Sequence, residues 1–174
     1  MRIFWTGLIL LSTSFTGVLA QRYGYVDTQF ILDQMPAYTE AQVALTKYSE
    51  QWVQEIEVLF EDVEKKKQKL KEEEILLPAE MIKSRQKEID ELEQRAKELQ
   101  KKRFGVGGDL FLKREELIKP IQDQVFKAIS DVAAESGYSF VFDKANQSNM
   151  LYADPKFDMS KQVLRKMGIK LVTN

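Results

Sequence analysis

The chain has 174 residues, about the length of one domain. Its 26 Lys and Arg residues nearly balance 27 Asp and Glu residues, so it lacks the excess positive charge that favours nucleic-acid binding. It contains no Cys and no His, which excludes disulfides, thiol nucleophiles, Cys-ligated metals and the commonest general base of enzymes. We therefore expect neither an enzyme nor a cofactor.

Residues 1–20 have the layout of a secretory signal peptide. Met1-Arg2 is a short positive region, and the apolar stretch from Ile3 to Leu11 is shorter than the roughly 20 residues of a bilayer crossing. Small residues then lead to Ala20, after which cleavage is expected. A lipid anchor is excluded because no Cys is available to carry one. A buried N-terminal helix is the less favoured alternative.

The mature chain begins with a predicted strand and continues into a long helix. Residues 22–27 (RYGYVD) are aromatic and β-branched, which predicts a strand, and residues 28–35 favour a short helix that ends at Pro36. Residues 38–77 contain neither Gly nor Pro, which predicts one helix about 60 Å long. Its apolar residues recur at coiled-coil spacings, although Lys66 and Glu73 interrupt the seam and are expected to weaken its distal half. The apolar seam consists of Leu45, Trp52, Ile56, Leu59, Val63, Leu70 and Leu77.

A second helix is predicted to return along the first. It begins at Pro78, since proline is preorganised for a first helical turn, and extends to about Phe104. Because almost no linker separates the two helices, they must form an antiparallel hairpin. Each helix has only a narrow apolar stripe, so the hairpin is expected to project into solvent as an arm. The stripe of the second helix consists of Ile82, Ile89, Leu92, Ala96 and Leu99.

A glycine-rich segment, Gly105–Gly108, interrupts the returning helix. Asp109 is expected to cap the restart, Pro120 to kink the helix and Gly137 to end it. The apolar stripe is denser after the break, which predicts that this part of the helix reaches a core. That stripe consists of Phe111, Ile118, Ile121, Val125, Ala128 and Val132.

The C-terminal part predicts two further strands and a last helix. Residues 138–143 (YSFVFD) alternate as a strand does, and residues 149–153 (NMLYA) predict a third strand. Asp158 is expected to cap a helix whose apolar face includes Val163 and Leu164. The four acidic residues Asp27, Asp143, Asp154 and Asp158 match no calcium loop, so we assign them to caps and turns.

The expected fold class is α+β. Residues 21–37 and 109–174 form a small β-rich hub, and residues 38–108 form the helical hairpin arm. Three strands leave two open edges on a core that is small for one chain, so oligomerisation is expected to cover them. The candidate hub residues are Tyr25, Val26, Phe140, Val141, Phe142 and Leu151.

Three segments resemble the Skp/OmpH family of periplasmic chaperones. They are residues 23–32 (YGYVDTQFIL), 117–144 (LIKPIQDQVFKAISDVAAESGYSFVFDK) and 151–168 (LYADPKFDMSKQVLRKMG), in that order after a cleavable signal. The resemblance implies a periplasmic homotrimer whose strands pair across subunits. Three hairpin arms would then enclose a cavity that holds unfolded outer-membrane proteins without ATP. The chain has no glycine-rich phosphate loop of the Walker kind, in agreement with the last point.

The charge of the arm departs from this family, whose best-known members are strongly basic. Residues 55–103 contain 13 Lys or Arg and 14 Asp or Glu. This balance does not favour binding of lipopolysaccharide or anionic lipid, and it predicts weak steering of acidic clients. The lysine-rich run at residues 65–71 is interpreted as a solvated helix face, because acidic residues flank it on both sides.

The candidate client-binding residues are Trp52, Phe60, Leu76 and Leu77. Trp52 alternatively packs on the opposite helix, which we favour, whereas the tip leucines either contact clients or staple the turn. The leading hypothesis is an ATP-independent holdase, a chaperone that keeps clients unfolded through many weak contacts. The alternative is a coiled-coil scaffold or tether of the cell envelope, but the weak distal seam favours the holdase.

Overall fold

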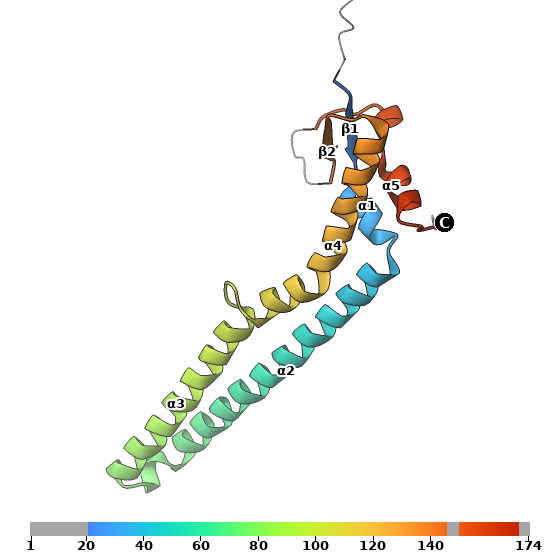
Figure 1. The fold of residues 1–174 in the computed structure, drawn as a ribbon. Helices are drawn as coiled ribbons and strands as arrows, with labels where there is room; N and C mark the ends of the chain where they lie inside the picture. The colour runs from blue at the N-terminus through green and yellow to red at the C-terminus, as the bar shows by residue number, and fades with distance from the viewer. Residues whose placement is uncertain (1–20, 146–149, 171–174) are drawn as a thin grey trace, which may run out of the picture.

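A computed structural model describes residues 21–145 and 150–170. The chain forms a small hub and a long helical arm that projects from it (Figure 1). The elements in chain order are β1 (Tyr23–Val26), α1 (Thr28–Asp33), α2 (Pro36–Glu73), the 3₁₀ turn η1 (Glu74–Leu76), α3 (Ala79–Phe104), α4 (Asp109–Ser136), β2 (Phe140–Asp143), the 3₁₀ turn η2 (Pro155–Phe157) and α5 (Ser160–Lys166).

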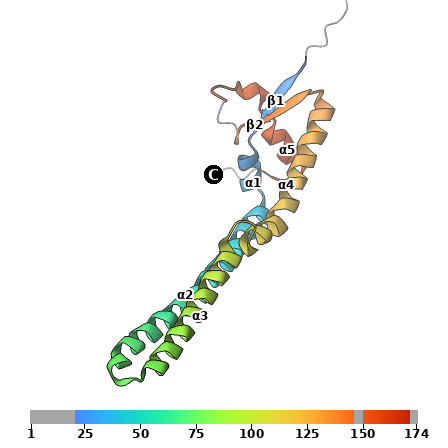
Figure 2. The same ribbon diagram turned by 90° about the vertical axis from the view of Figure 1, so that its left-hand side faces the viewer.

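The arm is the predicted antiparallel hairpin. Helices α2 and α3 lie side by side over most of their length, and η1 with Pro78 closes the far end (Figures 1 and 2). The buried seam residues are those that the heptad spacing selected, among them Ile56, Val63, Leu70 and Ile89. Pro36 occupies the first turn of α2 rather than only ending the helix before it, because a proline needs no backbone donor there.

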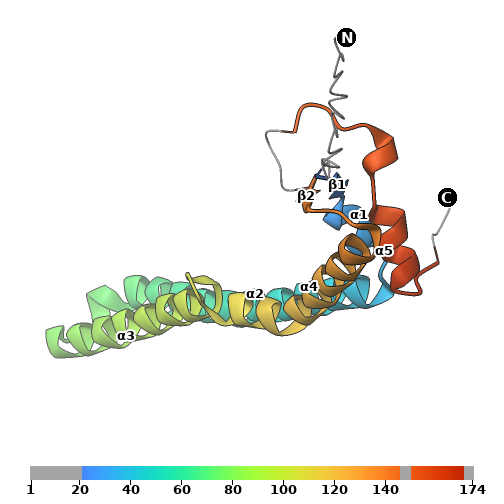
Figure 3. The ribbon, with the colours of Figure 1, turned by 45° about the horizontal axis from the view of Figure 1, so that its top comes forward.

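The hub is built around α4, which leaves the arm and reaches the core. One face of α4, including Ile121, Val125 and Val132, is buried. The other core side chains are Val26, Ile31, Leu32, Met35, Tyr38, Ala41, Met159, Val163 and Leu164. Helix α5 contacts both α4 and α1 (Figure 3). The core therefore joins the two ends of the chain, as the sequence predicted.

The sheet that the described residues form has two parallel strands. β1 and β2 pair in the register Tyr23 with Phe140 through Val26 with Asp143. Parallel neighbours need a long crossover, and here the whole arm with α4 supplies it. A single bridge joins Tyr25 to Asp158 beyond the second edge of β1.

The predicted third strand is wrong for its described residues. Residues 150–153 have no regular structure, and Leu151 and Tyr152 are exposed. Their apolar character resembles a strand in sequence, but β1 receives only the single Asp158 bridge on that side. Asn149 and the predicted signal peptide lie outside the described residues.

Two predicted helix caps differ from the expected ones by one position. Gly108 rather than Asp109 is the N-cap of α4, and Asp109 lies in the first turn, where its carboxylate is free to bind another side chain. Met159 is the N-cap of α5, while the Asp158 carboxylate accepts hydrogen bonds from the backbone and hydroxyl of Ser160. Pro120 lies inside α4, which changes direction along its length in Figure 1, and Gly137 ends α4 in a left-handed conformation, as predicted.

Candidate functional site

The distal half of the arm is held by a small apolar cluster. Val63, Leu70 and Ile89 are almost fully buried, and Leu77, Ile82 and Leu92 pack against them. This cluster has no fully buried residue in common with the hub core. These three buried side chains therefore stabilise the distal arm separately from the hub.

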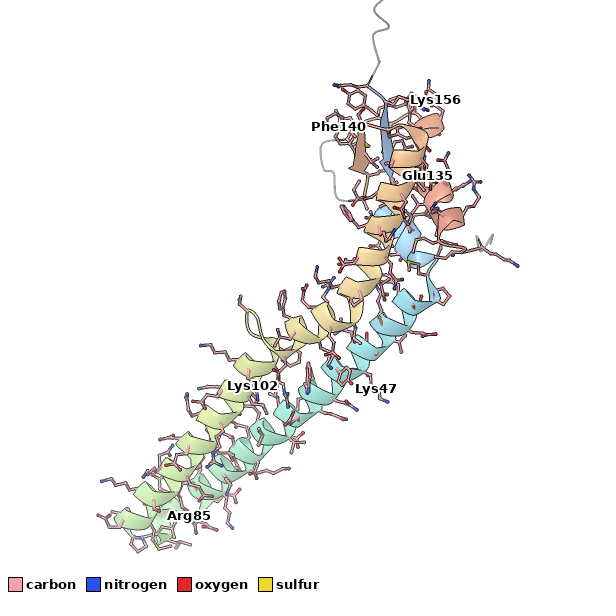
Figure 4. All side chains as sticks on the ribbon, viewed as in Figure 1. Lys47, Arg85, Lys102, Glu135, Phe140 and Lys156 are labelled. Carbon is pink, nitrogen blue, oxygen red and sulfur yellow. The ribbon has the colours of Figure 1, made fainter. Side chains whose placement is uncertain are left out.

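Charged side chains occupy two seam positions, and each finds a partner across the hairpin. The ammonium of Lys66 lies 2.7 Å from a carboxylate oxygen of Glu88, and Glu73 pairs with Arg85 near the tip (Figure 4). Ion pairs that remain in contact with solvent stabilise a protein only weakly. The predicted weak half of the seam is thus bridged by ion pairs, which replace apolar burial only in part.

Acidic side chains of both arm helices pair with the lysine-rich run of α2. Lys67 and Lys97 lie 2.8 and 2.6 Å from the carboxylate of Glu93. Their hydrogen bonds lower the pKa of Glu93 to about 2, so the carboxylate stays ionised at neutral pH. This pairing agrees with a solvated helix face and leaves little free charge for an anionic ligand.

Trp52 lies in a cluster of side chains where α2 passes the glycine-rich break. Its ring packs edge-on against Phe104, with ring centres 6.5 Å apart, and tilts against Tyr48 at 5.8 Å. The guanidinium of Arg103 lies over the same ring, 4.9 Å from its centre. The structure thus shows the favoured packing of Trp52 on the returning helix.

The other three candidate client residues sit at different depths on the arm. Phe60 is half-buried and lies among acidic residues of the same helix at a shallow hollow. At the tip, Leu77 packs against the distal cluster, whereas Leu76 is 83% exposed. Ile75, beside Leu76, is 94% exposed. Leu77 therefore staples the turn, and Ile75 and Leu76 are free to contact another molecule.

A second group of exposed apolar side chains surrounds the glycine-rich break, and sequence reasoning missed it. Val106 is fully exposed in the loop, and Phe111 and Leu112 are more than half exposed in the first turns of α4. Phe111 was expected to continue the buried stripe of α4, which is wrong, because the buried face begins only at Ile118. The glycine-rich break was the available sequence signal, because a helix that restarts after a break need not bury the face that the preceding helix buried.

The hub presents an apolar face beside the sheet. Phe140 and Phe142 are 51% and 45% exposed, and the Phe140 ring stacks on Tyr23 at 5.5 Å (Figure 4). A hollow of about 420 Å³ adjoins Phe142 and Tyr23, lined largely by aromatic and apolar residues that include Tyr138 and Tyr152. Neither phenylalanine therefore lies in the core of the single chain.

The remaining hub candidates divide between core and surface. Tyr25 and Val26 are buried in β1, and Val141 packs against the core from β2. Burial raises the pKa of the Tyr25 hydroxyl, as do the nearby carboxylates of Asp158 and Asp154. Leu151 is 97% exposed.

The acidic residues of the hub act as caps and turn formers, as expected. Asp27 accepts a hydrogen bond from the backbone of Phe30, and Asp143 accepts two from Thr28. Asp154 accepts one from the backbone of Lys156. Across residues 21–145 and 150–170, no group of three or more side chains has the arrangement of a metal site. Within the same residues, no helix is both long and apolar enough for a bilayer crossing.

Comparisons with known proteins match this architecture. The family model of OmpH-like outer membrane proteins matches residues 22–167. The chaperone protein Skp of Vibrio cholerae serotype O1 is 28% identical over 166 residues, which cover 91% of this chain and 92% of that protein. The crystal structure of a candidate OmpH-like outer membrane chaperone from Caulobacter crescentus superimposes with a TM-score of 0.68. The alignment covers 99% of this chain and 95% of the Caulobacter crescentus chain at 10% sequence identity, so this likeness supports the fold alone.

The family model spans the hub, the whole arm and the return through α4, β2 and α5, and ends one residue after α5. The three segments that carried the resemblance in the sequence all lie within it or overlap it. The chain therefore belongs to the OmpH-like outer membrane protein family.

Proposed function

We propose that this protein is an ATP-independent holdase chaperone that keeps outer-membrane β-barrel proteins unfolded until they are assembled. The observation that carries the proposal is the family match across residues 22–167, joined to a two-helix arm whose buried apolar cluster is small. The Vibrio cholerae relative is itself a chaperone by name. Client contacts on such an arm must be weak and numerous, because release occurs without ATP.

The client is proposed to touch apolar side chains that are scattered over the arm. Leu76 and Ile75 at the tip are almost fully exposed, and Phe60 lies half-buried on the shaft. Trp52 is a weaker candidate because its ring is covered by neighbours, and Leu77 because it packs on the distal cluster. The near neutrality of the arm means that these contacts, rather than long-range charge, hold the client.

Three copies of the chain are proposed to assemble through the hub. Phe140 and Phe142 with the adjoining hollow form an apolar surface that one chain leaves uncovered, and the short parallel sheet leaves backbone groups available at its edges. Leu151 is available at the same end of the molecule. A trimer built in this way directs three arms around a shared cavity.

The site of action is proposed to be the periplasm. Residues 1–20 have the composition of a secretory signal, with cleavage expected near Ala20. Binding to lipopolysaccharide or anionic lipid is not part of the proposal, because the lysines of the arm are largely paired with acids.

The test is a dilution experiment with a denatured β-barrel protein. The barrel is diluted from denaturant into buffer with or without residues 21–174 of this protein, and light scattering measures aggregation. The holdase predicts suppressed scattering at about one trimer per client. Unchanged scattering with an intact trimer would overturn the proposal and favour the alternative, a coiled-coil scaffold or tether of the envelope.

A further inference from the structure

The returning side of the arm is interrupted, while the other side is continuous. Helix α3 ends at Phe104 and α4 begins at Asp109, but α2 runs without a break beside both of them. A two-helix arm with a break in one helix would bend at that level unless side chains bridge it.

Arg103 makes that connection with one guanidinium group. One of its terminal nitrogens lies 2.6 Å from the carboxylate of Asp109 in α4, and the other lies 3.0 Å from the carboxylate of Glu55 in α2. The planar group also covers the ring of Trp52 in α2. The Arg103 side chain is 22% exposed, less than the other charged side chains in the ion pairs of the arm. We refer to Arg103, Asp109, Glu55 and Trp52 together as the clasp.

The loop is shaped so that the clasp closes. A Cβ on Gly105 would lie 2.3 Å from the carbonyl oxygen of Lys101, and a Cβ on Gly108 would lie 2.6 Å from that of Lys102. Gly107 has a φ of +70°, a region that favours glycine. Three glycines in four residues thus let the chain turn tightly against the end of α3, which brings Asp109 within reach of Arg103.

We propose that the clasp is a conformational device that sets the stiffness of the arm. While the clasp is closed, α3, α4 and α2 move as one rod. When it opens, the start of α4 separates from α2, the arm bends at the level of the break, and the ring of Trp52 is uncovered. This inference goes beyond the proposed chaperone role and does not depend on it, since the device acts in the free protein.

Closure of the clasp depends on the two carboxylates that neutralise the Arg103 guanidinium. Desolvation lowers the pKa of Arg103, but the hydrogen bonds and charges of Asp109 and Glu55 together outweigh it and raise the pKa, so the guanidinium stays charged. Removing both carboxylates leaves a partly buried cation without an ion-pair partner, which favours the open form. Lys113, which lies over the ring of Tyr48 and pairs with Glu116, stands beside the clasp and outside it.

The test keeps Arg103 and changes its partners. The variant carries Glu55→Gln and Asp109→Asn, and the control carries Glu57→Gln and Glu115→Gln, two exposed acids with the same total change in charge. Trp52 is the single tryptophan of residues 21–174, so its fluorescence reports on the clasp directly. The variant should show emission shifted to longer wavelength and stronger quenching by acrylamide, while the control matches the parent.

Bending is measured by spin labels, which the absence of natural cysteines makes simple. Labels at Ser84→Cys in α3 and Gln124→Cys in α4 lie on either side of the break, and both positions are exposed. The parent and control should give one narrow distance distribution, and the variant a broader one. A variant as narrow as the parent, or a control as broad as the variant, would overturn the proposal.

Arg103→Ala provides a second variant, compared with Lys102→Ala at the neighbouring exposed position. Loss of hydrogen bonds to a charged group should speed exchange of the Leu112 amide, the first-turn donor to Gly108, by about tenfold. Unchanged exchange in folded Arg103→Ala protein would likewise refute the clasp. None of these measurements includes a client, so their failure leaves the holdase proposal untouched.

Discussion

Phe140→Asp is the sharpest test of assembly through the hub. In one chain Phe140 is 51% exposed and touches Tyr23 by stacking rather than the core. A Phe side chain has roughly 200 Å² of surface, so a partner that covers the exposed half buries about 100 Å². At about 25 cal/mol per Å², this burial stabilises the assembly by about 2.5 kcal/mol per chain. An aspartate at this position removes that stabilisation of the assembly and adds the free-energy cost of burying a charge.

The expected result is dissociation without unfolding. A loss of about 2.5 kcal/mol corresponds to a change in affinity of roughly fiftyfold to a hundredfold, which sedimentation at several protein concentrations resolves. Far-ultraviolet circular dichroism should stay close to that of the parent, because the core around Val26 and Val163 does not include Phe140. Leu76→Asp, at the exposed tip of the arm, is the matched control and should leave the mass unchanged.

Two outcomes would refute this reasoning. A Phe140→Asp protein that sediments as the parent does, over the same range of concentration, would show that the aromatic face of the hub lies outside the interface. A protein that loses most of its helix signal would show that the hub of a single chain depends on Phe140, contrary to its half-exposed position.

Three further predictions concern the arm. Deleting residues 63–99, closed by a short turn, removes the distal cluster and the tip but keeps the Glu55–Arg103 pair. The product should stay trimeric by sedimentation but stop suppressing client aggregation. Undiminished suppression would place the client site on the hub. Client affinity is titrated with a labelled unfolded barrel protein, and it should change less than about tenfold between low and high salt, since apolar contacts are not screened. The same affinity should fall clearly in the double mutant Phe60→Ser/Leu76→Ser. Loss of binding at high salt would contradict this prediction. Ile89→Ala should cost about 2–5 kcal/mol and speed hydrogen exchange in the distal arm only, whereas Val58→Ala, on the exposed face, should not.

Local sequence patterns determined the elements of this protein and their order. Heptad spacing identifies the residues that the hairpin buries, because side chains three and four positions apart share a helix face whatever lies beyond it. Pro78, the glycine-rich break and Gly137 mark helix boundaries for equally local reasons, namely the backbone conformations that these residues favour. The family resemblance rested on the same ordered segments, and the family match spans them.

Tertiary structure decided what each surface contacts. Residues 150–153 have the composition of a strand, but a strand exists only where a neighbour offers its backbone, and β1 offers a single bridge there. Likewise, the alternation of residues 138–143 shows that Phe140 and Phe142 share a face, and only the fold shows that this face is open.

The candidate site shows the same division. Exposure of Leu76 and burial of Leu77 follow from how the tip closes, which no spacing rule settles for adjacent residues. The partners of Lys66, Glu73 and Arg103 come from the facing helix of the hairpin. Periodicity therefore determines which side chains lie on one face, while burial and pairing depend on which other segment that face meets.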